Sequence, residues 1–329
     1  MPTRRERIEG GVLGALVGDA LGVPFEFKAP GEIPPRDRIE MVPPAGYFRS
    51  HADVPPGTFS DDGALLLALL ESLIERDGRF DADDFGGRLV AWRREGRLAV
   101  DGRVFDVGIQ TEDAIRRIAS GTPAAGAGPA GDRENGNGAL MRTLPVAFAV
   151  RGDDADLIET AHRQSRVTHG HPRSEACCAL YALWARRTSE GAIDPWREAV
   201  AVLRKKYAKD VVRARELEEH VRPDDPAPGG GTGYVVDALR SARWCVAAGD
   251  FEQVVRAAIS LGNDTDTTAC LAGGIAGLRD GIVGIPRRWR DALRGAEIYR
   301  PLLERLHRLD FGGGAAAQAA GGGAPIRLY

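Results

Sequence analysis

Hydrophobic and polar positions along the chain predict helices almost throughout. In most segments apolar residues recur every three to four positions, which indicates amphipathic helices. Residues 64–70 are apolar nearly all round, so that helix is expected to be fully buried. No convincing run of alternating residues indicates strands, and we predict an all-α domain. The predicted helices cover residues 64–70, 84–95, 108–120, 139–150, 153–164, 173–187, 195–207, 234–248, 251–261, 266–280 and 286–295.

One face of the predicted helix 266–280 consists of small residues. Glycine inside a helix costs about 1 kcal/mol relative to alanine, so several of them in one helix need a reason. A face this small lets another backbone approach closely, and close packing behind a site that must be held rigid would offset the cost. The small residues on this face are Ala269, Ala272, Gly273, Ala276 and Gly277.

Three stretches rich in glycine and proline interrupt the helices. Residues 29–58 form a long segment of this kind, and long ordered loops are often functional. Residues 121–138 and 222–233 are two further links. We expect one domain over residues 1–310 and a low-complexity Gly/Ala-rich tail over 311–329.

Composition narrows the class of protein. The 329 residues carry a net charge of -3 with acids and bases well mixed, and no basic block could follow a nucleic-acid backbone. The four cysteines lie in helix-like segments without zinc-type spacing, so they are expected to be buried reduced thiols. The apolar stretch 10–23 is short and contains Asp19, which argues against a signal peptide or a membrane span. A cytoplasmic location is the expectation.

Two short acidic clusters carry the strongest chemical signal. They are Ser60-Asp61-Asp62 and Asp264-Thr265-Asp266-Thr267, and each opens into a helix-like segment. Clustered carboxylates repel one another, whereas carboxylate and hydroxyl oxygens are the ligands that Mg²⁺ and Mn²⁺ prefer. Helix capping would explain either cluster alone, but two such clusters favour a metal site. An EF-hand does not fit, because the required downstream glycine and glutamate are missing.

Three further segments are candidates. Glu26 follows a tight, small-residue helix and either reaches a pocket or is a solvated acid at the start of a loop. The glycine-rich residues 134–142 could offer free backbone N–H groups to a phosphate. His169 and His171 lie in a short linking turn, where one is structural or the pair forms part of a zinc site, although no zinc-type partners lie nearby.

Taken together, these segments resemble the ADP-ribosylglycohydrolase family, collinearly over residues 7–293. The motifs that carry the resemblance are G-D-A-L-G-V-P-F-E, G-T-F-S-D-D, D-V-G-I-Q-T, N-G-A-L-M-R, T-H-G-H-P and L-G-N-D-T-D-T. Each is modest alone, and all in this order are specific. Ser60 stands where relatives often have threonine, which keeps the hydroxyl. Asn263 stands where glycine is common, so the local turn there is expected to differ.

The resemblance implies a compact, orthogonal all-α bundle with two divalent cations, Mg²⁺ or Mn²⁺. Glu26 matches a glutamate beside the metals that serves variously as ligand, gate or catalytic group. By position, the metal ligands are Ser60, Asp61, Asp62, Asp264, Asp266 and Thr267. By position, the residues that hold the ADP-ribose part of the substrate or line its cleft are Asp106, Gly136, Asn137, Gly138, Met141 and His169.

The resemblance also implies a hydrolase that cleaves the glycosidic bond at C1″ of ADP-ribose and releases the unmodified acceptor. The acceptor would be a protein side chain such as arginine or serine, a modified nucleic acid or a related conjugate. We expect the enzyme to be a monomer and not to bind a membrane. Glu26 is the first choice for general acid/base, with a metal-bridging aspartate, Asp61 or Asp266, as the alternative. A non-catalytic ADP-ribose binder and a metal-dependent phosphatase or nucleotide hydrolase remain open.

Overall fold

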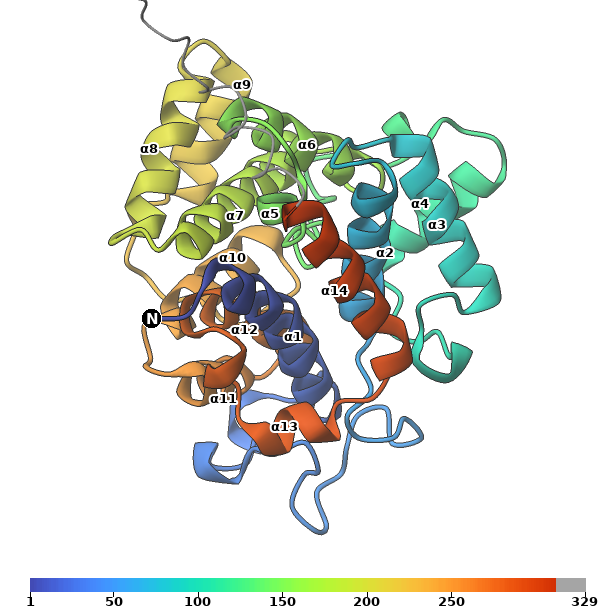
Figure 1. Ribbon diagram of the computed structural model, residues 1–329, viewed down its shortest axis with the longest axis vertical. Helices are drawn as coiled ribbons and strands as arrows, with labels where there is room; N and C mark the ends of the chain where they lie inside the picture. The colour runs from blue at the N-terminus through green and yellow to red at the C-terminus, as the bar shows by residue number, and fades with distance from the viewer. Residues whose placement is uncertain (312–329) are drawn as a thin grey trace, which may run out of the picture.

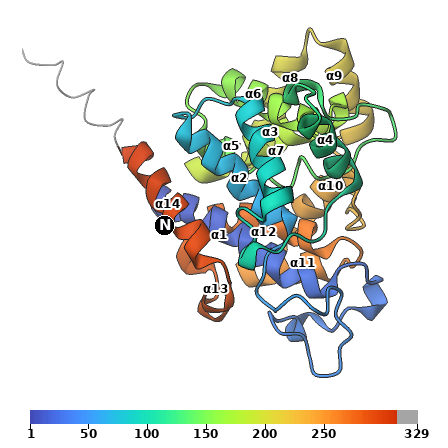
Figure 2. The same cartoon turned by 90° about the vertical axis from the view of Figure 1, so that its right-hand side faces the viewer.

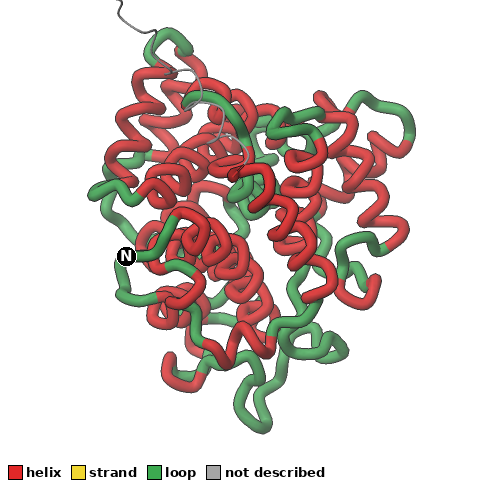
Figure 3. The backbone as a smooth tube through the Cα atoms, viewed as in Figure 1, coloured by secondary structure: helices red, strands yellow, loops and turns green. Residues whose placement is uncertain are grey.

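The computed structural model describes residues 1–311, which form helices joined by loops without any strand (Figures 1 and 3). The predicted all-α fold is therefore confirmed. The helices are α1 (Arg4–Gly22), α2 (Asp61–Glu75), α3 (Ala82–Glu95), α4 (Ile109–Ala119), α5 (Val146–Ala149), α6 (Asp154–Arg166), α7 (Pro172–Glu190), α8 (Pro195–Tyr207), α9 (Val211–Arg215), α10 (Val235–Val246), α11 (Phe251–Ile259), α12 (Thr265–Asp280), α13 (Arg287–Ala292) and α14 (Ala296–Phe311). Single helical turns complete the described part: η1 (Val23–Phe25), η2 (Pro30–Glu32), η3 (Arg36–Arg38), η4 (Val100–Gly102), η5 (Ala124–Gly126), η6 (Glu216–Val221) and η7 (Ile282–Gly284).

Helices α1 and α12 lie side by side and antiparallel at the centre of one half of the molecule (Figures 1 and 2). Their contact is made of backbone against backbone. A Cβ at Gly14 would lie 2.4 Å from the carbonyl oxygen of Gly273, and one at Gly18 would lie 2.1 Å from that of Ala269. The small-residue face predicted for α12 is thus confirmed, and its partner is α1. The end of α1 consequently lies against the beginning of α12.

Helix α2 is buried from Asp61 to Ile74, in agreement with its apolar sequence. It packs against α1, α3, α12 and α14, so its first turn lies inside the protein rather than at the surface. Among the described residues, one helical stretch, α1 together with η1 (Arg4–Phe25), is long and apolar enough to cross a membrane by length and composition alone, and 94% of its most apolar 18-residue window is buried within the protein. Its packing against α12 accounts for that apolar character.

The prediction of a helix over residues 139–150 was largely wrong. Only α5, Val146–Ala149, is α-helical there. Side chains take the carbonyls that a helix would use: Arg142 Nη1 donates to Gly138 O at 3.2 Å, and Thr143 Oγ1 donates to Ala139 O at 2.8 Å. Pro145 has no N–H to donate and disfavours helical geometry before it. The sequence analysis also missed helix α14. The predicted tail lies outside the described residues from position 312 onward.

A candidate metal centre and substrate cleft

Backbone hydrogen bonds join the segment after α1 to the segment before α12. Phe27 N–H donates to Asn263 O at 2.6 Å, and Asn263 N–H donates to Lys28 O at 2.7 Å. Phe27 and Asn263 both have left-handed backbones, with φ of 60°. Asparagine tolerates this conformation better than most residues, which explains how it serves where glycine is common. These two backbone hydrogen bonds hold Glu26, the residue before Phe27, beside Asp264, the residue after Asn263.

The two acidic clusters converge, as the sequence analysis predicted. Oxygen atoms of Glu26, Asp264 and Asp266 all lie within 4.8 Å of one another. Thr267 Oγ1 donates to Asp62 Oδ1 at 3.2 Å and thereby joins the start of α12 to the start of α2.

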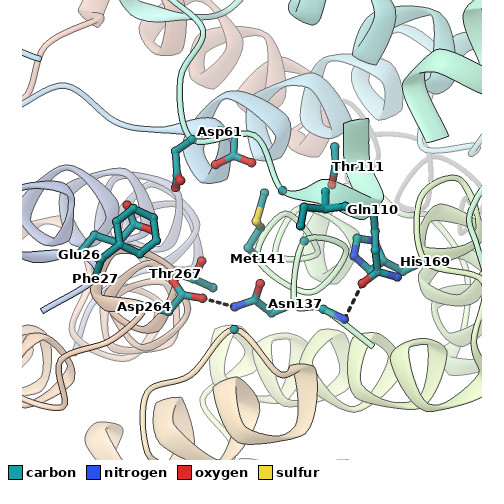
Figure 4. A pocket seen from close by; sticks show the side chains of 16 residues that line it. Glu26, Phe27, Asp61, Gln110, Thr111, Asn137, Met141, His169, Asp264 and Thr267 are labelled. Carbon is teal, nitrogen blue, oxygen red and sulfur yellow. Dashed lines mark hydrogen bonds between the residues drawn. The ribbon is translucent and has the colours of Figure 1, made fainter. Parts of the chain in front are cut away.

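Helix capping accounts for part of the first acidic cluster but does not account for Asp264 in the second. Ser60 Oγ accepts the N–H of Asp62 at 3.2 Å, as a helix cap should. Asp264 occupies the corresponding position of α12, yet its side chain makes no capping hydrogen bond. Its Oδ2 instead accepts the side-chain amide of Asn137 at 2.7 Å (Figure 4). The Asp264 side chain is therefore directed toward the cavity that Asn137 lines rather than toward its own helix.

Asp19 belongs to the same cluster, and the sequence analysis missed its role. It is fully buried on α1, and its carboxylate accepts the N–H groups of Ser60 and Gly63 at 2.8–3.0 Å. Its oxygens form a second close group with those of Asp62 and Asp266, again within 4.8 Å. The available signal was a single acid inside the apolar stretch 10–23.

The electrostatics of the cluster are unfavourable without a counter-ion. Burial, followed by repulsion from neighbouring carboxylates, raises the pKa values of Asp61, Asp62 and Asp266 well above their usual range. Burial and the nearby Asp106 raise the pKa of Glu26 to about 11. Two carboxylates about 4 Å apart repel by on the order of 4 kcal/mol near a protein surface. Within residues 1–308, no arginine or lysine forms an ion pair with these acids.

The donor set fits divalent cations. Oδ2 of Asp62 and Oδ2 of Asp266 are buried without any hydrogen-bond partner among the described residues. Buried carboxylate oxygens rarely lack a partner, because leaving one unsatisfied costs about 1–3 kcal/mol or more. Carboxylate and hydroxyl oxygens without cysteine or histidine suit Mg²⁺ or Mn²⁺. These acidic groups could therefore hold a metal ion.

A cavity of about 260 Å³ opens beside the acidic cluster (Figure 4). Glu26, Asp61, Asp264 and Thr267 line one side, whereas Asp62 and Asp266 are buried behind it. The structure thus brings both acidic clusters and all the predicted substrate-binding residues to one place. The predicted substrate-binding residues that line the cavity are Asp106, Gly136, Asn137, Gly138, Met141 and His169.

The glycine-rich loop does not offer all its N–H groups. Gly136 N–H donates to Gln110 Oε1 at 2.8 Å, and Asn137 N–H donates to Gly233 O at 3.0 Å. Among the described residues, no hydrogen bond uses the N–H groups of Gly138 or Ala139, and of these two residues only Gly138 lines the cavity. The loop also leads into turns rather than into a helix start.

The two histidines of the linking turn have separate roles. His171 caps α7 through Nδ1, which accepts the N–H of Arg173 at 3.1 Å. His169 is buried against the cavity wall, with Nδ1 2.8 Å from Thr168 Oγ1. A Cβ at Gly138 would lie 3.0 Å from its Cε1, so the glycine lets the loop approach the ring. The two side chains are directed to different partners, which argues against a shared zinc site.

His51 is a second residue that the sequence analysis missed. Its Nε2 lies 2.8 Å from Oε2 of Glu26, and its ring packs between Phe27 and Phe105 at centroid distances of 5.8 and 5.2 Å. Its backbone is left-handed, with φ of 48°. His51 comes from the long loop 29–58, so this loop contacts Glu26, which lines the cavity. Only the length of the loop pointed to it.

Comparisons with known proteins bear out the family resemblance. The ADP-ribosylglycohydrolase family model matches residues 1–316. The chain is 30% identical over 307 residues to "ADP-ribosylarginine hydrolase Tri1" of Pseudomonas putida, covering 92% of this chain and 78% of the relative. It is 31% identical over 295 residues to "ADP-ribosyl-[dinitrogen reductase] glycohydrolase" of Rhodospirillum rubrum, covering 89% and 92%. A solved structure, "ADP-ribosylglycohydrolase-related protein complex", superposes with a TM-score of 0.74 at 32% identity, covering 94% of this chain and all of the other.

Proposed function

The chain belongs to the ADP-ribosylglycohydrolase family, and we propose that it is a metal-dependent hydrolase acting on ADP-ribose conjugates. It cleaves the glycosidic bond at C1″ and releases ADP-ribose and the unmodified acceptor. One observation carries the proposal: a single cavity combines the oxygen-only acidic centre with the loop 136–138 and His169. A binding module would need the loop but not the costly, unpaired carboxylates beside it.

The cation-binding residues would be Ser60, Asp61, Asp62, Asp264, Asp266 and Thr267. A divalent cation held there would supply a Lewis acid that lowers the pKa of water and orients ribose hydroxyls. The partnerless oxygens of Asp62 and Asp266 support this assignment. Asp19 would hold the first turn of α2 in place through the N–H groups of Ser60 and Gly63.

Glu26 is placed to move the proton that the reaction needs. With its pKa raised to about 11 by burial and by Asp106, its carboxyl group keeps a proton at neutral pH in the cation-free protein. It would give this proton to the acceptor atom as the bond to C1″ breaks and the electron pair leaves with the acceptor. The attacking water adds to C1″ and gives up its proton to an ionised carboxylate, for which we propose Asp61, since it lines the cavity.

The diphosphate and the distal ribose would lie along the glycine loop. The free N–H group of Gly138 would be a donor for phosphate oxygens, and Asn137 would orient the ribose beside Asp264. Burial lowers the pKa of His169 to about 3, so this ring faces the substrate as a neutral group. Met141 completes the apolar floor of the cavity.

Arginine is the acceptor that the site favours. Asp106 lines the cavity beside the centre and is not paired with any arginine or lysine of the described residues, so a cationic guanidinium would be attracted to it. The Pseudomonas putida relative is named for ADP-ribosylarginine.

The test is a substrate panel assayed with Mg²⁺, with Mn²⁺ and with a chelator. We expect ADP-ribosyl-arginine to be hydrolysed to arginine and ADP-ribose, the rate to vanish with chelator, and Glu26→Gln to lose about 10²- to 10⁴-fold. ADP-ribose binding without release of product would identify a binder instead. Cleavage of free ADP-ribose at the diphosphate would identify a phosphatase-type or nucleotide-type hydrolase.

A further inference from the structure

Residues 229–233, the glycine segment, lie between the two halves of the proposed site. Asn137 N–H donates to Gly233 O at 3.0 Å, and Asp264 N–H donates to Gly231 O at 2.8 Å. Asn263 Nδ2 also donates to Gly230 O at 2.9 Å. The backbone of one substrate-loop residue and that of one proposed metal ligand are therefore both held by carbonyls of a single short segment.

The glycine segment cannot fix its own conformation. Four of its five residues are glycines, and glycine loses more conformational freedom on ordering than any other residue. No side chain of the segment packs into the core, since Thr232 is exposed. Something outside the segment must therefore set the positions of its carbonyls.

That external support comes from the start of α10. Asp237 accepts three hydrogen bonds from the segment: Gly230 N–H donates to Oδ1 at 2.8 Å, while Thr232 N–H and Thr232 Oγ1 donate to Oδ2 at 2.7 and 2.8 Å. Ser241, one turn further on and fully buried, accepts the N–H of Gly231 at 3.0 Å. Hydrogen bonds to an ionised carboxylate are among the stronger ones in proteins.

We infer that Asp237 is a positioning residue that holds the substrate loop and the metal ligand Asp264 in register through the glycine segment. Asp237 itself lies outside the cavity lining and is not expected to contact the cation or ADP-ribose. The inference rests on the proposed function and goes beyond it by naming the residue that couples its two subsites. Outer-shell residues of this kind typically change metal affinity about 10- to 100-fold when removed.

A simple structural role makes a different prediction. Asp237 lies in the first turn of α10, where an acid also stabilises the helix dipole. Asp153 is a matched control, because it accepts the N–H groups of Ala155 and Asp156 at the start of α6, which does not line the cavity. Removing either acid should cost some stability, but only Asp237 should affect ligand binding.

The experiment compares wild type, Asp237→Ala, Ser241→Ala and Asp153→Ala by calorimetric titration with Mn²⁺ alone and with ADP-ribose alone, after confirming helix content by circular dichroism. We expect Asp237→Ala to weaken both ligands by about tenfold or more, and Asp153→Ala to change each by less than about twofold. Ser241→Ala should weaken both in the same way, and it carries the test if Asp237→Ala does not fold.

Two results would overturn the inference. One is wild-type affinity of the Asp237 variant for both ligands, and the other is loss of only one of them. Neither result would contradict the proposed function, because the wild-type protein would still bind both Mn²⁺ and ADP-ribose. A wild-type protein that binds neither Mn²⁺ nor ADP-ribose would instead overturn the proposed function together with this inference.

Discussion

A Cβ atom at Gly18 would lie 2.1 Å from the carbonyl oxygen of Ala269, closer than any real Cβ contact. Helices α1 and α12 are thus packed backbone to backbone at the level of the acidic centre. Glu26 follows α1 and Asp266 lies in the first turn of α12, so the separation of the helices sets the separation of these carboxylates. The stripe of small residues determines the geometry of the site as well as the stability of the fold.

Gly18→Ala should therefore destabilise the protein and weaken Mn²⁺ binding together. The methyl group must push two backbones apart, and overpacking of this kind costs about 1–3 kcal/mol or more. Chemical denaturation measures the stability loss, and titration with Mn²⁺ measures the second effect. Gly87→Ala is the matched control, because Gly87 is exposed on α3 with nothing within 4 Å of its Cβ position. That change should stabilise the protein by up to about 1 kcal/mol. Equal effects of the two substitutions would contradict the argument.

The His51 side chain should matter for turnover more than for substrate affinity. Its Nε2 holds Oε2 of Glu26 at 2.8 Å, while His51 itself is absent from the cavity lining. We expect His51→Ala to lower kcat by about tenfold or more, because the carboxyl group of Glu26 loses its orientation. KM should change little, and His51→Gln, which keeps a hydrogen-bonding group, should recover part of the rate. An increase confined to KM would assign His51 to substrate binding instead.

Asp266→Asn should raise the thermal stability of the cation-free protein. It replaces a buried carboxyl group, whose ionisation is opposed by burial and by the neighbouring carboxylates, with an amide that cannot ionise. Each kcal/mol gained corresponds to about 1–2 °C in Tm for a chain of this length. In wild type, Mn²⁺ should raise Tm by mass action, and in the variant this rise should disappear. Differential scanning calorimetry with and without Mn²⁺ separates the two effects. A variant that still responds fully to Mn²⁺ would remove Asp266 from the ligand set.

Much of the fold was predictable because local sequence patterns determine where the helices lie. Amphipathic periodicity marked helices such as α8, whose bounds were predicted at residues 195–207 and are Pro195–Tyr207 in the structure. The acidic clusters were predictable because each combines carboxylates with a hydroxyl at a helix start. The convergence of Asp62 with Thr267, 205 residues apart in the chain, followed from the charge argument rather than from any local pattern.

The residues that escaped prediction depend on distant partners. Asp19 looked like an odd acid in the apolar stretch 10–23, since the N–H groups it accepts lie more than 40 residues further along the chain. The turns over residues 139–145 looked helical because Ala139 and Leu140 favour helices, but the side chains of Arg142 and Gln164 bind the carbonyls of that segment. No sequence pattern pointed to Asp237, because its proposed role depends on the hydrogen bonds that it accepts from the glycine segment.

The last prediction concerns the pH dependence of stability. Burial, with a smaller contribution from Arg142, lowers the pKa of His169 from its usual 6.5 to about 3. Below about pH 6.5 the unfolded chain binds a proton at this residue that the folded protein does not bind. The stability contributed by neutral His169 is therefore complete above that pH and is lost progressively as the pH falls toward about 3, by up to about 1.4 kcal/mol per pH unit.

His169→Asn isolates this contribution, because an amide can keep the contact to Thr168 but does not titrate. Free energies of unfolding measured from about pH 7.5 to about pH 4.5 should fall more steeply for wild type than for the variant. The other titrating groups affect both proteins equally, so the difference between the two slopes reports His169. His220→Asn, at a partly exposed histidine in η6, provides the control and should follow the wild-type slope. Parallel curves for wild type and His169→Asn would mean that the folded protein takes up the proton at His169. The ring could then face a diphosphate as a cation, and its neutral role in the proposed substrate site would have to be abandoned.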